Sequence, residues 1–387
     1  MKIAVINTYS NGSTGVIAES IANYASHNNH TVKMFYGREK TVANNWTFVG
    51  ESKLPLLISN ALTFITGKVG SFHKKSTKRL INELSKFNPD VIHLHNIHGN
   101  YLNFKILFKY LSSFNGKVII TAHDEFLITG RCALCFCNKW KTGCSKCKFL
   151  SAYPRVLVDF SKKLQREKIE FLKRIKNLKI VTPSNWLKSY FSESLLSFAD
   201  CRCIHNGIKK DTPSSFDISS LVEKNKINLI FSAYTWSVEK GSKIIKELYN
   251  IIDKRKFNII VTGVTKSCNR MFDFDCKKIG LLNRSNLLYL ISKCDVFINP
   301  TFKDNLPTIL IESIQVGTPV LTFDTGGCKE IIDSTCGVVV KEKTAQALLK
   351  ELNDFDYSKE WKSACQRKAK EFEPLVVYSN YLELYEK

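Results

Sequence analysis

Short apolar runs alternate with longer segments of helical periodicity along most of the chain. This pattern is typical of parallel α/β sheets. In the first half, the runs predict strands at residues 2–7, 31–35, 91–94, 117–122, 179–183 and 202–205. In the second half, they predict strands at residues 227–233, 258–262, 296–299 and 319–323. The pattern therefore predicts an α/β fold of two doubly wound domains, whose ligands bind beyond the carboxyl ends of the strands.

The two sets of strands are separated by residues 206–215, which are rich in turn formers and lack apolar periodicity. We therefore expect a first domain over residues 1–206, a second domain over residues 207–370 and a terminal helix over residues 371–387. The length of 387 residues agrees with this division, because it exceeds the usual size of a single core.

Composition adds a strong positive charge to an otherwise ordinary globular chain, with 44% apolar and 24% charged residues. The net charge is +22, from 57 basic and 35 acidic side chains, which favours anionic partners: phosphates, nucleic acid or an acidic lipid surface. The densest basic stretch, residues 161–179, also carries apolar residues at roughly helical spacing. It could lie on a negative membrane face or pack its apolar stripe on its own domain.

The chain opens on a buried-strand pattern rather than on a secretion signal, and no apolar run approaches the length of about eighteen residues that spans a bilayer. Without an export signal, the 13 cysteines are expected to be mostly reduced thiols of a cytoplasmic protein.

The most informative segment is residues 300–331, which follows a predicted strand and contains a helix start. Asp304 and Glu312 bracket that start, so we expect both carboxylates and the free backbone N–H groups between them to face one crevice. Helix-start amides bind an anionic diphosphate, and carboxylates accept hydrogen bonds from sugar hydroxyls. The segment therefore predicts a nucleotide-sugar site, with these donor-binding candidates: Asn305, Leu306, Pro307, Thr308 and Glu312.

This ordered string, together with the sequence from Gly317 to Val320 and the pair Gly326–Gly327, resembles the donor-site signature of family 4 glycosyltransferases. Those are retaining enzymes of the GT-B fold. The resemblance implies two Rossmann-like domains that face a central cleft and a terminal helix that returns to the first domain. It also implies transfer of a hexose from a nucleotide-diphosphate sugar to a saccharide or lipid-linked acceptor, with no catalytic metal.

Lys240 precedes a helical segment of the second domain, where a lysine can neutralise the departing diphosphate. Asp304 stands where the family usually has glutamate, so the contact with the sugar hydroxyls is expected to be similar in kind but shorter by one methylene. Lys240 and Asp304, with His123 of the first domain, are the predicted catalytic residues.

The first domain supplies further candidates at predicted strand ends. Gly15 belongs to the first turn, where Ser13 or Thr14 can cap the next helix and where the resemblance places the loop that faces the donor phosphate. His123 ends a buried strand, where a histidine of near-neutral pKa could donate to an oxygen or relay a proton. The resemblance implies that His123 contacts the donor sugar. The acceptor-side candidates are His95, Asn96, His98 and Asp124.

The histidines at residues 93–98 allow two interpretations, a metal site or hydrogen-bonding groups near the acceptor. The cysteine-rich loop, residues 131–148, holds two close thiol pairs, which suit a structural zinc ion. Redox pairing and unliganded buried thiols are the alternatives. By resemblance to a subgroup of the family, the expected zinc ligands are Cys132, Cys137, Cys144 and Cys147, with Cys135 additional.

Relatives with such a cysteine loop serve bacterial exopolysaccharide, capsule or lipopolysaccharide assembly, which implies a cytoplasmic enzyme in peripheral contact with the anionic inner face of the plasma membrane. Two other functions stay open. A nucleotide-sugar 2-epimerase uses the same architecture without an acceptor. A zinc-containing nucleic-acid-binding protein would explain the charge and the cysteines, but its basic residues should cluster, and here they are spread along the chain, so no nucleic-acid partner is expected.

Overall fold

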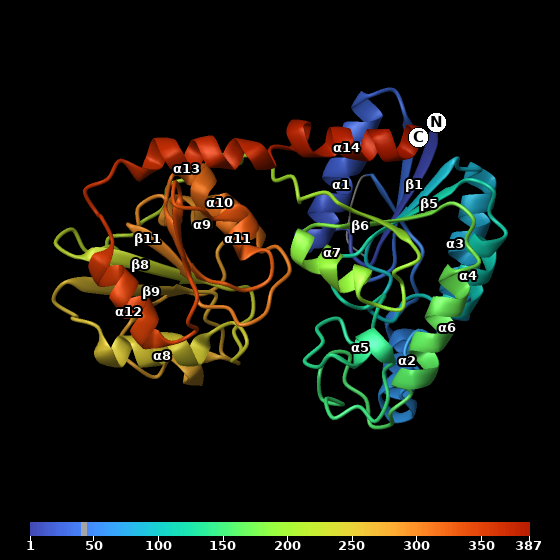
Figure 1. The fold of residues 1–387 in the computed structure, drawn as a ribbon, viewed down its shortest axis with the longest axis horizontal. Helices are drawn as coiled ribbons and strands as arrows, with labels where there is room; N and C mark the ends of the chain where they lie inside the picture. The colour runs from blue at the N-terminus through green and yellow to red at the C-terminus, as the bar shows by residue number, and fades with distance from the viewer. Residues whose placement is uncertain (40–44) are drawn as a thin grey trace. The chain divides into compact units, whose positions relative to one another are not determined.

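The computed structural model describes residues 1–39 and 45–387, which form two compact units. The first unit contains Met1–Gly207 and Val377–Lys387, and the second contains Ile208–Val376. Each unit is built on one sheet of parallel strands (Figure 1). The returning segment begins at Val377 rather than at residue 371.

The first sheet has seven strands in the order β3-β2-β1-β4-β5-β6-β7. The strands are β1 (Lys2–Asn7), β2 (Thr31–Tyr36), β3 (Trp46–Phe48), β4 (Val91–Leu94), β5 (Lys117–Thr121), β6 (Leu178–Thr182) and β7 (Asp200–Cys203). The helices of this unit are α1 (Gly12–His27), α2 (Lys53–Thr66), α3 (Lys74–Phe87), α4 (Phe104–Ser112), α5 (Lys139–Thr142), α6 (Ser161–Leu172), α7 (Asn185–Ser192) and α14 (Pro374–Glu386).

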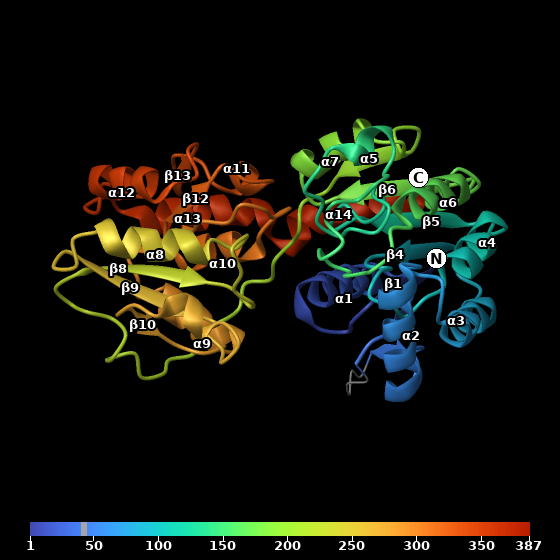
Figure 2. The same ribbon diagram turned by 90° about the horizontal axis from the view of Figure 1, so that it is seen from below.

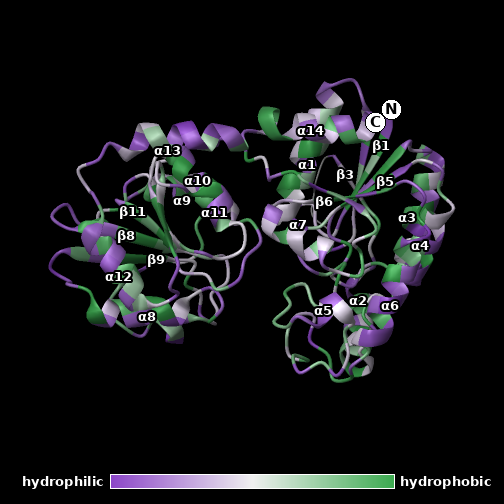
Figure 3. Cartoon of the chain, viewed as in Figure 1, coloured by the Kyte–Doolittle hydropathy of each residue, from purple (hydrophilic) through white to green (hydrophobic). Residues whose placement is uncertain are grey.

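Successive residues of β1 belong to different cores, because side chains of a strand alternate between the two faces of a sheet. Ala4 and Ile6 pack with residues of α3, α4 and α6, whereas Ile3 and Val5 pack with residues of α1 and α14. Both faces of the sheet are therefore covered, and the strands are seen as apolar segments in Figure 3.

Helix α14 is fastened to the first sheet through tyrosines at spacings of three and four. The Tyr385 hydroxyl lies 2.8 Å from His93 Nδ1, and the Tyr381 hydroxyl lies 3.2 Å from Thr121 Oγ1. The terminal segment is thus part of the core of the first unit, although almost the whole chain separates it from β1.

The basic stretch at residues 161–179 packs its apolar stripe on its own domain. The side chains of Leu164, Ile169, Leu172 and Ile175 are all buried. Of the two interpretations drawn from the sequence, the structure therefore favours the packed helix over a membrane face for this segment.

The second sheet has six strands in the order β10-β9-β8-β11-β12-β13. The strands are β8 (Ile227–Ser232), β9 (Phe257–Thr262), β10 (Lys277–Lys278), β11 (Val296–Asn299), β12 (Val320–Phe323) and β13 (Gly337–Val340). The helices are α8 (Ser242–Ile251), η1 (Asn269–Phe272), α9 (Arg284–Ile291), α10 (Thr308–Val316), α11 (Cys328–Ile331), α12 (Ala345–Asp354), α13 (Trp361–Ala369) and η2 (Lys370–Phe372).

Helices cover both faces of this sheet as well (Figure 2). Leu229 and Phe231 face a core shared with α8 and α12, whereas Ile230 and Phe297 face a core shared with α9, α10 and α13. Among the described residues, no helix combines the length and the apolar composition that crossing a bilayer requires.

Several local predictions were wrong. Strands β3, β10 and β13 were not predicted, because they are edge strands of two to four residues, too short for a periodicity. Strand β7 starts at Asp200 instead of residue 202, since Asp200 pairs with Lys179 in the ladder. Helix α1 is preceded by Asn11 as its N-cap, so Ser13 and Thr14 lie inside the helix and do not cap it.

Candidate functional site

In the second unit, the chain after β11 brings Asp304 against Lys240. Lys240 Nζ lies 2.6 Å from Asp304 Oδ2, and the other carboxylate oxygen accepts a hydrogen bond of 2.9 Å from the amide of Asn305. The Lys240 side chain is 39% exposed, so this pair is open to solvent and to a ligand. The two residues that sequence analysis assigned to catalysis in this domain are therefore in direct contact.

The backbone holds Lys240 in this position. The amide of Phe302 and the hydroxyl of Thr301 both donate to the carbonyl of Glu239, at 2.8 and 3.2 Å. Gly241 has a φ of +84°, and a Cβ atom there would lie 2.4 Å from the carbonyl oxygen of Pro300. Glycine at this position thus lets the loop that carries Lys240 pack against the end of β11.

The pair Gly326–Gly327 packs on the same segment from β12. Gly326 has a φ of +57°, and an added Cβ would lie 1.9 Å from the carbonyl oxygen of Asp304. The amide of Gly327 donates to the carbonyl of Asn305 at 2.7 Å. Three loops at the carboxyl ends of neighbouring strands β8, β11 and β12 are therefore joined at Asp304.

Helix α10 begins directly after these residues, at Thr308, with Pro307 as its N-cap. The N-cap residue makes no side-chain hydrogen bond to the first amides, and no acidic residue lies in the first turn. Its start therefore presents N–H groups and positive dipole without a negative side chain of its own. Leu306 packs its side chain in the core, so only its backbone is available to a ligand.

Glu312 faces a different cation, Arg284 of helix α9. Arg284 Nη2 lies 3.1 Å from Glu312 Oε1, and Arg284 Nε lies 2.9 Å from Asp211 Oδ2. Burial raises the pKa of Glu312, while the Arg284 guanidinium opposes that rise. Sequence analysis assigned no role to Arg284. A sequence feature that could have indicated it is its position at the start of α9, directly after Asn283, whose side chain caps the helix.

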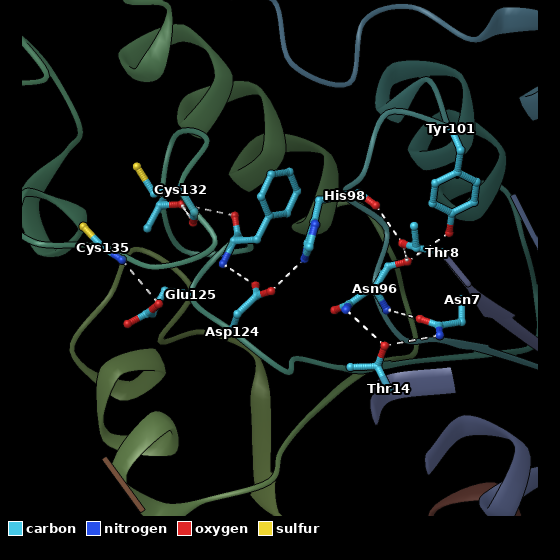
Figure 4. A network of polar contacts seen from close by, with 12 residues as sticks. Asn7, Thr8, Thr14, Asn96, His98, Tyr101, Asp124, Glu125, Cys132 and Cys135 are labelled. Atoms are coloured by element: carbon cyan, nitrogen blue, oxygen red, sulfur yellow. Dashed lines mark hydrogen bonds and ion pairs between the residues drawn. The ribbon is translucent and has the colours of Figure 1, made fainter. Parts of the chain in front are cut away.

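In the first unit, the ends of β1 and β4 are joined by amide side chains (Figure 4). The amide of Asn96 donates to Asn7 Oδ1 at 3.1 Å, and both asparagine side chains donate to Thr14 Oγ1 at 3.4 Å. Gly15 lies in the first turn of α1, where an added Cβ would lie 2.8 Å from the carbonyl carbon of Ser10. Glycine is required there for close packing of the helix on the loop.

Three histidines lie together at the ends of β4 and β5, with His93 and His95 buried and His123 half-buried. His93 Nε2 lies 2.8 Å from Thr121 Oγ1, and His95 Nδ1 lies 3.0 Å from His123 Nε2. Burial lowers the pKa of His93 to about 3 and that of His123 to about 4, and it lowers the pKa of His95 well below its usual value.

The expectation of a near-neutral pKa at His123 was therefore wrong, because the sequence does not show that its ring is buried against other histidines. At neutral pH, His123 is a neutral imidazole, which can donate one hydrogen bond. Both ring nitrogens of His93, and one each of His95 and His123, make hydrogen bonds within the domain, which agrees with the hydrogen-bonding interpretation.

His98 and Asp124 form a second polar pair next to this array (Figure 4). His98 Nε2 lies 2.7 Å from Asp124 Oδ2, and Asp124 Oδ1 accepts a hydrogen bond of 2.9 Å from the amide of Phe126. Burial alone would raise the pKa of Asp124, but His98 and the Phe126 amide outweigh it and lower the pKa. The acceptor-side candidates thus converge on the carboxyl ends of β4 and β5.

The cysteine-rich loop follows directly in the chain. Its five thiols line one cavity of about 80 Å³: Cys132, Cys135, Cys137, Cys144 and Cys147. No three of them bring their sulfur atoms within 4.8 Å of one another in the part of the chain that the structure describes. The Sγ atoms of Cys135 and Cys137 lie 3.6 Å apart.

Comparison with solved structures identifies the fold. The chain matches sucrose-phosphate synthase from Thermosynechococcus elongatus with a TM-score of 0.73 at 14% identity, covering 100% of this chain and 98% of that one. It matches Anabaena HepE, solved in complex with UDP, with a TM-score of 0.65 at 13% identity, covering 100% of both chains. The two parallel-sheet domains define the GT-B class of glycosyltransferase folds.

Residues 215–372, which make up most of the second domain, match the family model described as glycosyl transferases group 1. The chain is 27% identical over 279 residues to WcaC of Escherichia coli (strain K12), which is named for glycosyl transfer in colanic acid biosynthesis. This alignment covers 67% of the chain and 66% of WcaC.

The chain is also 25% identical over 175 residues to a Campylobacter jejuni transferase, covering 43% of this chain and 46% of that protein. That relative is named as an N,N'-diacetylbacillosaminyl-diphospho-undecaprenol α-1,3-N-acetylgalactosaminyltransferase. The predicted relation to glycosyltransferases of bacterial polysaccharide assembly is confirmed. Assignment to family 4 and retention of configuration stay predictions.

The buried histidines predict a specific dependence of stability on pH. Groups whose pKa is lowered by folding contribute stability that is complete above about pH 6.5 and is lost as the pH falls towards their folded pKa values. We expect the melting temperature of the first domain to fall between pH 7 and pH 5, because the unfolded chain takes up protons that the folded histidines exclude.

His93→Gln, which keeps a hydrogen-bonding side chain, should lower the melting temperature at pH 7 but flatten its pH dependence, as measured by differential scanning fluorimetry. The matched control is His27→Gln, which removes an exposed histidine of the same domain. A pH dependence of His93→Gln as steep as that of the wild type would contradict this account.

Proposed function

We propose that this protein is a glycosyltransferase that moves a hexose from a nucleotide-diphosphate sugar to a saccharide or lipid-linked acceptor in bacterial exopolysaccharide, capsule or lipopolysaccharide assembly. The observation that carries the proposal is the contact of Lys240 with Asp304 beside the uncapped start of α10, within the domain that matches the family. HepE binds UDP on the same fold, which supports a nucleotide-sugar donor.

On the donor side, the diphosphate would occupy the start of α10 and draw Lys240 Nζ away from Asp304. The lysine then neutralises charge that develops on the leaving diphosphate, and the released carboxylate accepts a hydrogen bond from a sugar hydroxyl. Glu312, held by Arg284, would accept hydrogen bonds from the ribose hydroxyls. Lys240 and Asp304 would therefore exchange their ion pair for contacts with the donor, whereas Glu312 would keep its pair with Arg284.

In the reaction, the bond between the anomeric carbon and the phosphate oxygen breaks and a bond to the acceptor oxygen forms. As a member of family 4, the enzyme would retain the anomeric configuration, and a phosphate oxygen of the donor would take the acceptor proton. His123 would donate a hydrogen bond to the sugar, since its imidazole is neutral at pH 7. His95, Asn96, His98 and Asp124 would orient the acceptor. These steps use no catalytic metal, so turnover should not require added Mg²⁺.

The alternatives are less well supported. The relatives reported above carry the names of glycosyltransferases, and none is named as a nucleotide-sugar epimerase or a nucleic-acid-binding protein. We propose that the enzyme works in the cytoplasm at the inner face of the plasma membrane. The name of the Campylobacter relative supports a membrane-bound acceptor, since it describes a sugar attached to undecaprenol through a diphosphate.

The proposal predicts that a panel of UDP-, GDP- and dTDP-sugars contains a donor that raises the melting temperature, since a bound ligand stabilises by mass action. Lys240→Met should weaken that donor at least about ten-fold and lower kcat/KM about a hundred-fold, the size expected when one charge-stabilising contact is lost. Asp304→Asn should have an effect of similar size.

The matched control is Lys243→Met, which removes an exposed lysine of the neighbouring helix α8. If Lys240→Met and Lys243→Met behave alike, Lys240 has no role at the diphosphate. Product analysis with donor alone separates the epimerase, because inversion at C2 without an acceptor would replace the transferase proposal.

We also propose that the cysteine-rich loop holds one structural zinc ion. Arg131 lines its cavity and is buried. Arg131 Nη2 lies 3.7 Å from Cys147 Sγ, and its buried Nε has no hydrogen-bond partner among the described residues. Lys168 is buried close to Cys144 and Cys132, and burial lowers its pKa to about 7. Four thiolates with Zn²⁺ carry a charge of about −2, which Arg131 would partly neutralise and which would favour the charged form of Lys168.

The expected ligands remain Cys132, Cys137, Cys144 and Cys147. Their sulfur atoms would have to draw together on binding, since thiolates bind zinc at about 2.3 Å. Metal analysis of protein purified without a metal-affinity tag should give about one zinc per chain, as coordination by four thiols predicts.

Cys144→Ser should lose that metal and lower the melting temperature, whereas the control Cys135→Ser should keep it. Wild-type protein with only a trace of zinc would overturn the metal site. Loss of the metal in Cys135→Ser alone would overturn the choice of ligands.

A further inference from the structure

Helix α2 (Lys53–Thr66) exposes apolar side chains and buries polar ones, the reverse of the usual arrangement in a surface helix. The residues it buries are polar, Ser59 and Thr63. Its large apolar side chains are between 39% and 67% exposed: Leu54, Leu57, Ile58, Leu62 and Ile65. A surface helix normally places its apolar stripe on the core.

The apolar surface continues onto the segment after the cysteine-rich loop. The amide of Leu157 donates to the carbonyl of Phe64 at 2.8 Å, and a Cβ added to Gly67 would lie 2.0 Å from the carbonyl oxygen of Val158. Leu157 and Val158 are both exposed. We call this set the α2 face: Leu54, Leu57, Ile58, Leu62, Ile65, Leu157 and Val158. Contiguous exposed apolar surface of this kind marks a contact with a partner.

Basic side chains surround the α2 face. Residues 53–68 contain no acidic side chain and have a lysine at each end. Beside the helix lies a cavity of about 500 Å³, which Pro55 and Ser59 share with Lys74, Lys75 and Arg79. The acidic residue of that cavity, Glu51, is already paired with His73, with Glu51 Oε2 3.1 Å from His73 Nδ1.

We propose that the α2 face is the surface by which this protein docks on a bilayer that contains anionic lipids. Its apolar side chains would enter the boundary between headgroups and acyl chains, and its basic rim would meet the lipid phosphates. A second copy of the chain fits less well, because two copies joined face to face would bring their basic side chains together.

The position of α2 connects this surface with the candidate acceptor side. Asn100 Nδ2, in the loop that follows His98, donates to Asn60 Oδ1 of α2 at 2.9 Å. A bilayer on the α2 face would therefore adjoin the loop that holds His98. The inference rests on the proposed function in this respect, since a lipid-linked acceptor presents its sugar at such a surface.

The test is flotation of the full-length protein with vesicles of phosphatidylcholine alone and with about 30% phosphatidylglycerol, at low and at high salt. The wild type should float with the anionic vesicles at low salt, and Leu57→Asp and Ile65→Asp should each reduce the bound fraction at least ten-fold. The matched control Leu375→Asp, which changes a leucine at the start of α14 that is 71% exposed, should bind as the wild type.

Equal binding of wild type and Leu57→Asp would overturn the proposal. The docking proposal would also be contradicted if sedimentation without vesicles found a dimer that Leu57→Asp dissociates, since the α2 face would then be an interface between copies. Donor-induced stabilisation should be unchanged in both variants. This readout separates the two proposals, because a protein that binds vesicles but no nucleotide-sugar would keep the docking surface and lose the transferase.

Discussion

The site in the second domain depends on one constraint, the joining of three loops around Asp304 at the carboxyl ends of β8, β11 and β12. The ion pair of Asp304 with Lys240 forms because backbone contacts hold the two loops in position. Gly241 and Gly326 allow approaches to Pro300 and Asp304 that no side chain would permit. Because these loops are fixed, a cation, an acid and a free helix start are arranged before any ligand arrives, which avoids ordering them during catalysis.

The two domains differ in the polar groups that they bring together. The second domain places its candidate groups in the pairs Lys240–Asp304 and Arg284–Glu312. In the first domain, burial lowers the pKa values of His93, His95 and His123 and so favours their neutral forms. This division suits the proposed chemistry, in which one side meets a diphosphate and the other offers hydrogen bonds to uncharged sugars.

Central strands could be predicted from the sequence because parallel strands buried on both faces appear as continuous apolar runs. Strands β4 and β11 have the predicted bounds for this reason. Lys240 and Asp304 were both predicted as catalytic residues, but their ion pair was not predicted, and neither was the partner of Glu312. Arg284 reaches Glu312 because α9 packs on α10, and such a tertiary contact leaves no periodic pattern in the sequence. The low pKa of His93 likewise depends on burial beside Tyr381 and Tyr385, which return from the far end of the chain.

The central claim is that a nucleoside diphosphate binds at the start of α10 beside Lys240. Hydrogen exchange followed by mass spectrometry tests it directly, with and without the nucleotide that stabilises the protein most. We predict slower exchange in peptides that cover residues 236–243 and 303–312, because their amides would donate to phosphate oxygens or be shielded by them. Protection confined to other peptides, at a nucleotide concentration that saturates the protein, would contradict the claim.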